Sequence, residues 1–149
     1  NYIEDETIFG SPAEKDLYVL LQNTEFYKSN KSNIKIIAQF PISKYIADEY
    51  HRYLPNYRVD FLLTLTKDGK QKSLILEYDG LEYHFRDSEN VTRYNYSSQY
   101  LEYDVQRQLE LESYGYKFLR LNKFNLTPSV NTETKVDVLN KLLMVNFEL

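Results

Sequence analysis

Two runs of β-forming residues, separated by a tight turn signal, constrain the fold of this chain most strongly. The runs extend from Tyr57 to Thr66 and from Ser73 to Asp79, and the residues between them include Lys67-Asp68-Gly69-Lys70. An Asp-Gly pair between two such runs is typical of a β-hairpin, because Gly adopts a left-handed backbone at no steric cost. We therefore expect these two runs to be antiparallel neighbours in a sheet.

The rest of the chain predicts helices and short strands around this hairpin. Ser11-Pro12-Ala13-Glu14 has the pattern of a helix start, with Ser11 as the N-cap and Glu14 completing a capping box. The expected elements are a helix over 11–23, a strand over 34–40 ended by Pro41, the hairpin, a helix from 97 or 98 to 113 ended by Gly115, a strand over 116–121, and a last helix capped by Asn131 or Thr132. This α-β-β-β-α-β-α order predicts an α/β fold in which helices flank a small mixed sheet.

Helical periodicity assigns the buried faces of the two later helices. For the helix that ends at 113, the pattern places Leu101, Val105 and Leu109 toward the core. For the last helix, the inward residues are Val136, Leu139, Leu142 and Leu143.

The composition fits one globular domain. The chain has 149 residues, of which 42% are hydrophobic and 15% aromatic, enough to bury a core. It contains no apolar run near the ~18 residues of a membrane helix, and no secretion signal at its start. The absence of Cys excludes disulfides and thiolate zinc sites and fits a reducing compartment, so we expect a cytoplasmic location. Because residue 1 is Asn rather than Met, we expect residues 1–149 to be a single domain of a longer chain.

The charge balance restricts how this chain would bind a nucleic acid. With 18 Lys and Arg against 22 Asp and Glu, the net charge is -4, which argues against tight, sequence-blind binding through bulk charge. A local basic groove, or carboxylates neutralised by metal ions, remains compatible with this balance. The 15 Tyr residues either provide stacking faces for bases or fill half-buried positions.

Three carboxylates interrupt the apolar hairpin. Side chains alternate along a strand, so Asp60 is expected on the face opposite to Val59 and Phe61. Glu77 and Asp79 are expected on the same face as Asp60. Acids within apolar strands cost free energy unless they are paired or bind a metal. Clustered carboxylates are the ligands that Mg²⁺ or Mn²⁺ prefers. Alternatively, the acids lie on a solvent-exposed face and pair with Arg58.

Several short motifs follow one another in a fixed order along the chain. They are Glu14, Gln39, Val59-Asp60-Phe61, Glu77-Tyr78-Asp79-Gly80, His84, Asp104 with Arg107, and Gly115-Tyr116-Lys117-Phe118-Leu119-Arg120. This ordered set resembles the PD-(D/E)xK nuclease superfamily, and most closely its branch containing the very short patch repair endonuclease. Relatives in that branch read, in outline, Gln, V-D-F, E-x-D-G-x-x-x-H, D-x-x-R and G-Y-x-x-L-R, with a Glu in the first helix. The resemblance implies a restriction-endonuclease-like α-β-β-β-α-β core over residues 11 to about 125.

The resemblance also implies an activity and roles for the acidic residues. It implies a Mg²⁺- or Mn²⁺-dependent nuclease that hydrolyses phosphodiester bonds, in DNA or alternatively in RNA, next to other domains such as a helicase. Asp60 would be the central metal ligand, Glu77 a second ligand, and Glu14 a further acid of the metal site. Asp79 would hold metal-bound water or orient His84, which would take the proton.

One departure from the superfamily pattern leaves two outcomes open. The motif lysine should stand two residues after Glu77, where this chain has Asp79. Either His84 takes over proton transfer, as in the repair-endonuclease branch, or the chain is an inactive nuclease fold that binds nucleic acid or protein. A chain without Cys is not expected to carry the structural zinc of the repair endonuclease.

Several further assignments have a purely structural alternative. Glu14 is equally explained by the capping box, His84 by a surface loop, and Asp104 with Arg107 by an ion pair on a helix surface. The residues expected to contact the nucleic-acid backbone are Arg86, Arg107, Lys117 and Arg120, together with Arg93 and Lys123.

Overall fold

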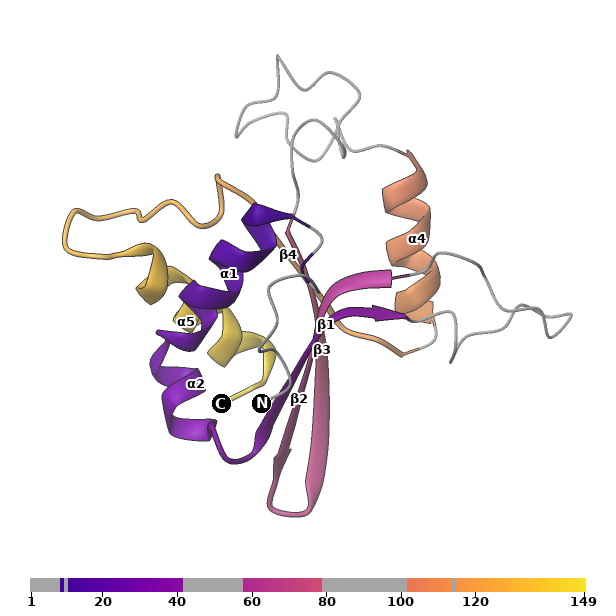
Figure 1. Cartoon of the computed structure of the whole chain (residues 1–149), viewed down its shortest axis with the longest axis horizontal. Coiled ribbons are helices and arrows are strands. Elements are labelled where there is room, and N and C mark those ends of the chain that lie inside the picture. Colours follow the sequence, from indigo (N-terminus) through magenta and orange to yellow (C-terminus); the bar gives the residue numbers. More distant parts are fainter. Residues whose placement is uncertain (1–8, 10, 42–57, 79–101, 114) are drawn as a thin grey trace, which may run out of the picture.

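A four-stranded mixed sheet forms the centre of the molecule (Figure 1). The computed structural model describes residues 9, 11–41, 58–78, 102–113 and 115–149. The strands are β1 (Ile34–Pro41), β2 (Arg58–Lys67), β3 (Lys70–Tyr78) and β4 (Phe118–Leu121), in the order β1-β2-β3-β4. The first three pair antiparallel, and β4 pairs parallel with β3. The mixed α/β class expected from the sequence is therefore confirmed.

The predicted hairpin is present and its strands extend closer to the turn than expected. Lys67 pairs with Lys70, so only Asp68 and Gly69 form the connection. Both have positive φ angles, 54° and 75°, as a two-residue turn of type I′ requires. This turn matches the right-handed twist of the strands and fixes the register of β2 against β3.

The helices agree with the sequence in type and differ in detail. In α1 (Pro12–Gln22) the Ser11 side chain accepts a hydrogen bond from the amide of Glu14, as expected for the N-cap. A short helix, α2 (Glu25–Asn30), was not predicted; Thr24 caps it. The last helix, α5 (Lys135–Asn146), is capped by Thr134 rather than by Asn131 or Thr132, because Thr134 forms a reciprocal capping box with Asp137.

Strand β1 ends differently from the prediction. Pro41 is the last residue of the strand, paired with Arg58, and does not lie beyond it. This is possible because β1 is at the edge of the sheet, where a residue without an amide hydrogen removes no ladder hydrogen bond.

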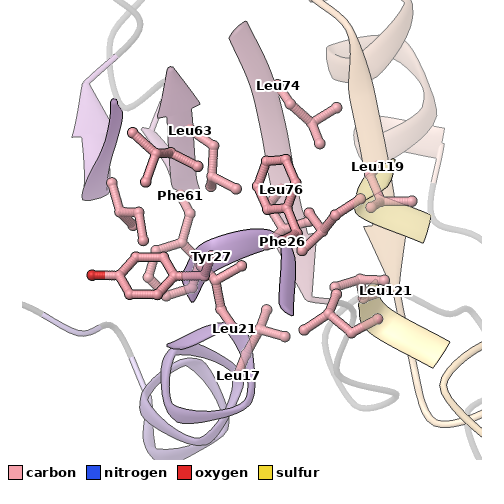
Figure 2. Packing of buried hydrophobic residues seen from close by; sticks show 14 of the residues in the cluster. Leu17, Leu21, Phe26, Tyr27, Phe61, Leu63, Leu74, Leu76, Leu119 and Leu121 are labelled. Atoms are coloured by element: carbon pink, nitrogen blue, oxygen red, sulfur yellow. The ribbon is translucent and has the colours of Figure 1, made fainter. Parts of the chain in front are cut away.

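One face of the sheet packs against α1, α2 and α5, which lie together on the left of Figure 1. Figure 2 shows how apolar side chains of two helices meet those of three strands; the labelled ones are Leu17 and Leu21 of α1, Phe26 and Tyr27 of α2, and Phe61, Leu63, Leu74, Leu76, Leu119 and Leu121 of the sheet. From α5, Leu139 and Leu143 are fully buried in the same cluster, as predicted.

The opposite face carries a smaller core under α4 (Glu102–Ser113). Its buried members are Val59, Leu62, Ile75 and Leu111. The prediction for this helix face was wrong at Leu109, which is 61% exposed, whereas Leu111 is fully buried. Two residues correspond to about 200° around a helix, so the two side chains point in nearly opposite directions. Leu101 and the side chain of Val105 lie outside the described residues.

α4 ends as the sequence predicts. Gly115 follows α4 with a φ of 94°, and its amide donates to the carbonyl of Glu112, as expected for a helix stop.

Among the described residues, no helix has the length and apolar character needed to cross a membrane.

We predict that Leu111→Ala destabilises the protein by ~2–5 kcal/mol, because it leaves a cavity between α4 and the sheet. The matched variant Leu109→Ala changes the same residue type in the same helix at an exposed position, and we expect an effect within about 0.5 kcal/mol. Urea denaturation of both variants measures the difference. Equal destabilisation would contradict the observed packing of α4.

Candidate active site

β1 and β2 bend together at Gln39 and Asp60. Their ladder pairs Ala38 with Phe61 and Phe40 with Val59 but is interrupted in between, where Gln39 has a φ of 52°. Figure 1 shows the end of β1 and the start of β2 curving toward α4, away from the line of β3. The sheet therefore opens into a fork at this level.

This bend corrects the expected alternation of side chains in β2. Phe61 packs in the large core on one face, whereas Val59 packs in the small core under α4. The two residues do not share a face, because the interruption at Gln39 and Asp60 shifts the pleat of both strands. A regular period of two cannot reveal such an interruption.

Asp60 and Glu77 meet in this fork. The pairing of β2 with β3 ends at Phe61 and Leu76. Beyond it, the amide of Tyr78 donates to Oδ2 of Asp60 at 2.7 Å, and the Asp60 and Glu77 side chains hydrogen-bond to each other. The Asp60 carboxyl thus takes the place of a strand backbone as the partner of β3, and the expected proximity of these two acids is confirmed.

Glu14 approaches the same place from the first turn of α1. It is only 8% exposed, and its Oε1 accepts a hydrogen bond from Nε2 of Gln39 at 2.7 Å. Its backbone amide donates a hydrogen bond to Oγ of Ser11, the N-cap of α1. Of the expected capping box, the structure shows this bond from the Glu14 amide to the Ser11 side chain. The Glu14 carboxylate accepts from Gln39 and lies close enough to Asp60 to act on it electrostatically.

The electrostatics of the fork are dominated by like charges. Burial, followed by the negative charges of Glu77 and Glu14, raises the pKa of Asp60 from 3.8 to about 9. The hydrogen bond from the Tyr78 amide opposes this rise. With a pKa of about 9, Asp60 holds a proton at neutral pH in the free protein.

Only part of the expected metal site lies in the described residues. Among these residues, no group of three or more Asp, Glu, His or Cys side chains is arranged to hold a metal ion. Asp60 and Glu77 form the close pair, and Glu14 is the nearby third acid. Asp79 and His84, expected to complete the site, lie outside the described residues. Their roles stay predictions.

Of the expected basic residues, Arg120 lies beside the fork. It is the neighbour of Glu77 across the parallel strands β3 and β4. Its Nε donates to Oε1 of Gln108 in α4, and its carbonyl accepts from Asn125. Arg120 therefore connects β4, the neighbour of the strand that carries Glu77, to α4.

The other basic residues are placed less fully. Lys117 donates from Nζ to the carbonyl of Asn146 at 2.6 Å, which gives it a structural role at the end of α5. Arg86 and Arg93 lie outside the described residues, and so do the side chains of Asp104 and Arg107, although the backbone of α4 that carries them is helical. Contacts of these residues with nucleic acid remain predictions.

Sequence reasoning did not foresee the contacts of Gln39 and Gln108. Gln39 was noted only as part of a motif, and nothing in its neighbourhood indicates a left-handed backbone. Gln108 had no motif at all. Its position in the helix expected beside the last strand was the one available signal.

Comparison of this chain with protein-family models, with curated proteins and with solved structures gives no match. The fold and the site by themselves define a mixed α/β domain with buried carboxylates gathered where its sheet divides.

We predict that Asp60 makes the folded protein less stable at high pH. Because its pKa is about 9 in the folded protein and near 3.8 when unfolded, the folded state holds the extra proton between these values. The stabilisation from that proton is fully present below the lower pKa and is lost as the pH rises through the higher one. It changes by up to ~1.4 kcal/mol per pH unit.

Urea denaturation in a chelating buffer between pH 5 and pH 9 tests this. Asp60→Asn should lose this part of the pH dependence and exceed the parent in stability at pH 8. Parallel pH profiles for the parent and Asp60→Asn would show that the carboxyl of Asp60 is not perturbed.

Proposed function

We propose that this chain is a Mg²⁺- or Mn²⁺-dependent nuclease domain that hydrolyses phosphodiester bonds in DNA. The observation that carries the proposal is the close pair of Asp60 and Glu77 at the fork, with Glu14 near enough to act on Asp60 electrostatically. These acids come from β2, β3 and α1, respectively. These are the three positions at which the resemblance to the PD-(D/E)xK superfamily implies metal-binding acids. Their proximity is unfavourable without a cation, because the charges of Glu77 and Glu14 both raise the free energy needed to ionise Asp60.

The order and pairing of the helices and strands also support a restriction-endonuclease-like core. A helix is followed by three antiparallel strands, a second helix and a strand parallel to the third. This is the α-β-β-β-α-β order that the superfamily has, with α2 as an addition after the first helix.

The donors at the fork fit a hard divalent cation. All three acids offer oxygen atoms, and two of them are already in direct contact. A bound Mg²⁺ or Mn²⁺ would supply a water of lowered pKa and neutralise charge on the scissile phosphate. Asp60 and Glu77 would hold the ion, and the Tyr78 amide would keep the Asp60 carboxylate oriented.

The remaining steps fall to other side chains of this chain. His84 would accept the proton of the attacking water, and its ordinary pKa near neutrality suits that task. Arg120, next to Glu77, and Arg107 on α4 would contact phosphate oxygens through charge-assisted hydrogen bonds. Asp79 would orient His84.

A second candidate function follows from the residue that stands two positions after Glu77. It is Asp79 and not the lysine of the superfamily motif. A nuclease fold without that lysine can be retained as a binding module for nucleic acid or protein. The two functions differ in whether the parent protein cleaves any substrate when Mg²⁺ or Mn²⁺ is present.

We predict that Asp60→Ala abolishes both Mn²⁺ binding and cleavage, because it removes the expected central metal ligand, which both Glu14 and Glu77 approach. Asp68→Asn is the matched control: it also removes one negative charge, but from the hairpin turn, and Asn tolerates the positive φ there. Calorimetry with Mn²⁺ and an assay on single-stranded, duplex and flapped DNA and on RNA measure the two properties. A parent protein that binds Mn²⁺ yet cleaves none of these substrates would favour the binding module.

We predict that His84→Ala keeps Mn²⁺ affinity and lowers the cleavage rate by ~10²–10⁴-fold, the usual contribution of a general base. His51→Ala is the control, since it removes the other histidine of the chain. Single-turnover cleavage of the preferred substrate of the panel gives the rates. If His84→Ala cleaves as fast as the parent, the proton must leave by another route.

A further inference from the structure

Gln39 has a backbone conformation that its place in the chain does not explain. Among the described residues, three that are not glycine have a positive φ: Gln39, Asp68 and Glu148. Asp68 is in the hairpin turn, and Glu148 follows the end of α5. Gln39 instead lies within β1, where a left-handed residue is costly and persists only if its surroundings hold it.

Contacts on two sides hold Gln39 in this conformation. Its carbonyl accepts a hydrogen bond from Nη1 of Arg58 at 3.1 Å. Its side-chain amide donates from Nε2 to Oε1 of Glu14 at 2.7 Å. The backbone is thus fixed to β2 and the side chain to α1, and the residue connects the two elements that deliver Asp60 and Glu14 to the fork.

We propose that Gln39 is a positioning residue that aims the Glu14 carboxylate at the Asp60–Glu77 pair, and that its left-handed backbone is what turns its amide toward α1. This inference rests on the proposed metal-dependent function. It adds a residue to which neither the motif nor the expected chemistry assigns a role.

The chemistry of an amide suits this task. Glu has three rotatable side-chain bonds, and a donor on Oε1 restricts the orientation of its carboxylate. A neutral amide also leaves the negative charge of Glu14 intact, whereas a Lys or Arg in its place would cancel part of the charge that attracts a cation. Hydrogen bonds that orient metal-binding carboxylates typically contribute 10- to 100-fold in metal affinity.

The same residue acts on Asp60 through the backbone. The ladder between β1 and β2 is interrupted at Gln39 and Asp60, and this interruption bends β2 at the carboxyl that enters the fork. Gln39 therefore influences two of the three acids, Glu14 by its side chain and Asp60 by its conformation.

Two pairs of variants separate the side chain from the backbone. Gln39→Ala and Gln39→Gly both remove the side-chain amide, but only Gly relieves the strain of the left-handed backbone. Asp68→Ala and Asp68→Gly make the same comparison in the hairpin turn, away from the fork. Mn²⁺ affinity by calorimetry and thermal unfolding with and without Mn²⁺ are measured for all four variants and the parent.

We expect Gln39→Ala and Gln39→Gly to weaken Mn²⁺ binding by the same ~10- to 100-fold, with Gln39→Gly the more stable of the two. Both Asp68 variants should keep the affinity of the parent, although Asp68→Ala unfolds at a lower temperature. For DNA cleavage, kcat should fall in both Gln39 variants and KM should remain that of the parent.

The outcomes distinguish this inference from the function on which it rests. If the parent binds Mn²⁺ and both Gln39 variants bind it equally well, Gln39 does not position Glu14, and the nuclease proposal stands. If Gln39→Gly keeps the affinity and Gln39→Ala loses it, only the backbone matters and the role of the amide is overturned. If the parent binds no Mn²⁺, both proposals fail.

Discussion

The hydrogen bond from the Tyr78 amide to the Asp60 carboxyl lies at the point where the sheet divides. A backbone amide at the end of a strand pair needs an acceptor, because an unpaired buried donor costs ~1–3 kcal/mol. Here a side chain provides it, and this frees β2 to leave β3 and follow β1 toward α4. Without an acceptor in the fork, the two strands would either continue to pair or expose the amide to water.

The two hydrophobic cores hold the fork open from opposite sides. The large core, under α1, α2 and α5, fixes β2 and β3 as far as Phe61 and Leu76. The small core under α4 holds Val59 after the bend, together with Leu111. At the fork between these two apolar regions, burial and the charges of Glu77 and Glu14 raise the pKa of Asp60. The unfavourable ionisation of Asp60 at this place supports the proposal of a cation-binding site.

Local patterns in the sequence predicted the hairpin, the start of α1 and the positions of the main strands, because each of these depends on residues that are neighbours in the sequence. Asp68-Gly69 specifies its turn, and Ser11 with Pro12 specifies a helix start. The nearness of Asp60 and Glu77 was also predictable, since it follows from one hairpin register. The bend at Gln39 and the burial of Leu111 in place of Leu109 were not, because they result from packing between segments distant in sequence. The cap at Thr134 was missed although its pattern, Thr followed three residues later by an acid, is readable.

The interruption in β1 also affects the edge of the sheet, where a strand of another chain could pair. β1 is an edge strand, and an edge with a long regular row of free amides and carbonyls can pair with a strand of another chain. In β1 the left-handed Gln39 breaks that row, and Pro41 contributes no amide hydrogen at its end. In the described sheet, the regular part of this edge is thereby limited to Ile34–Ala38, so the residue that shapes the fork also shortens the row of backbone groups open to strand addition.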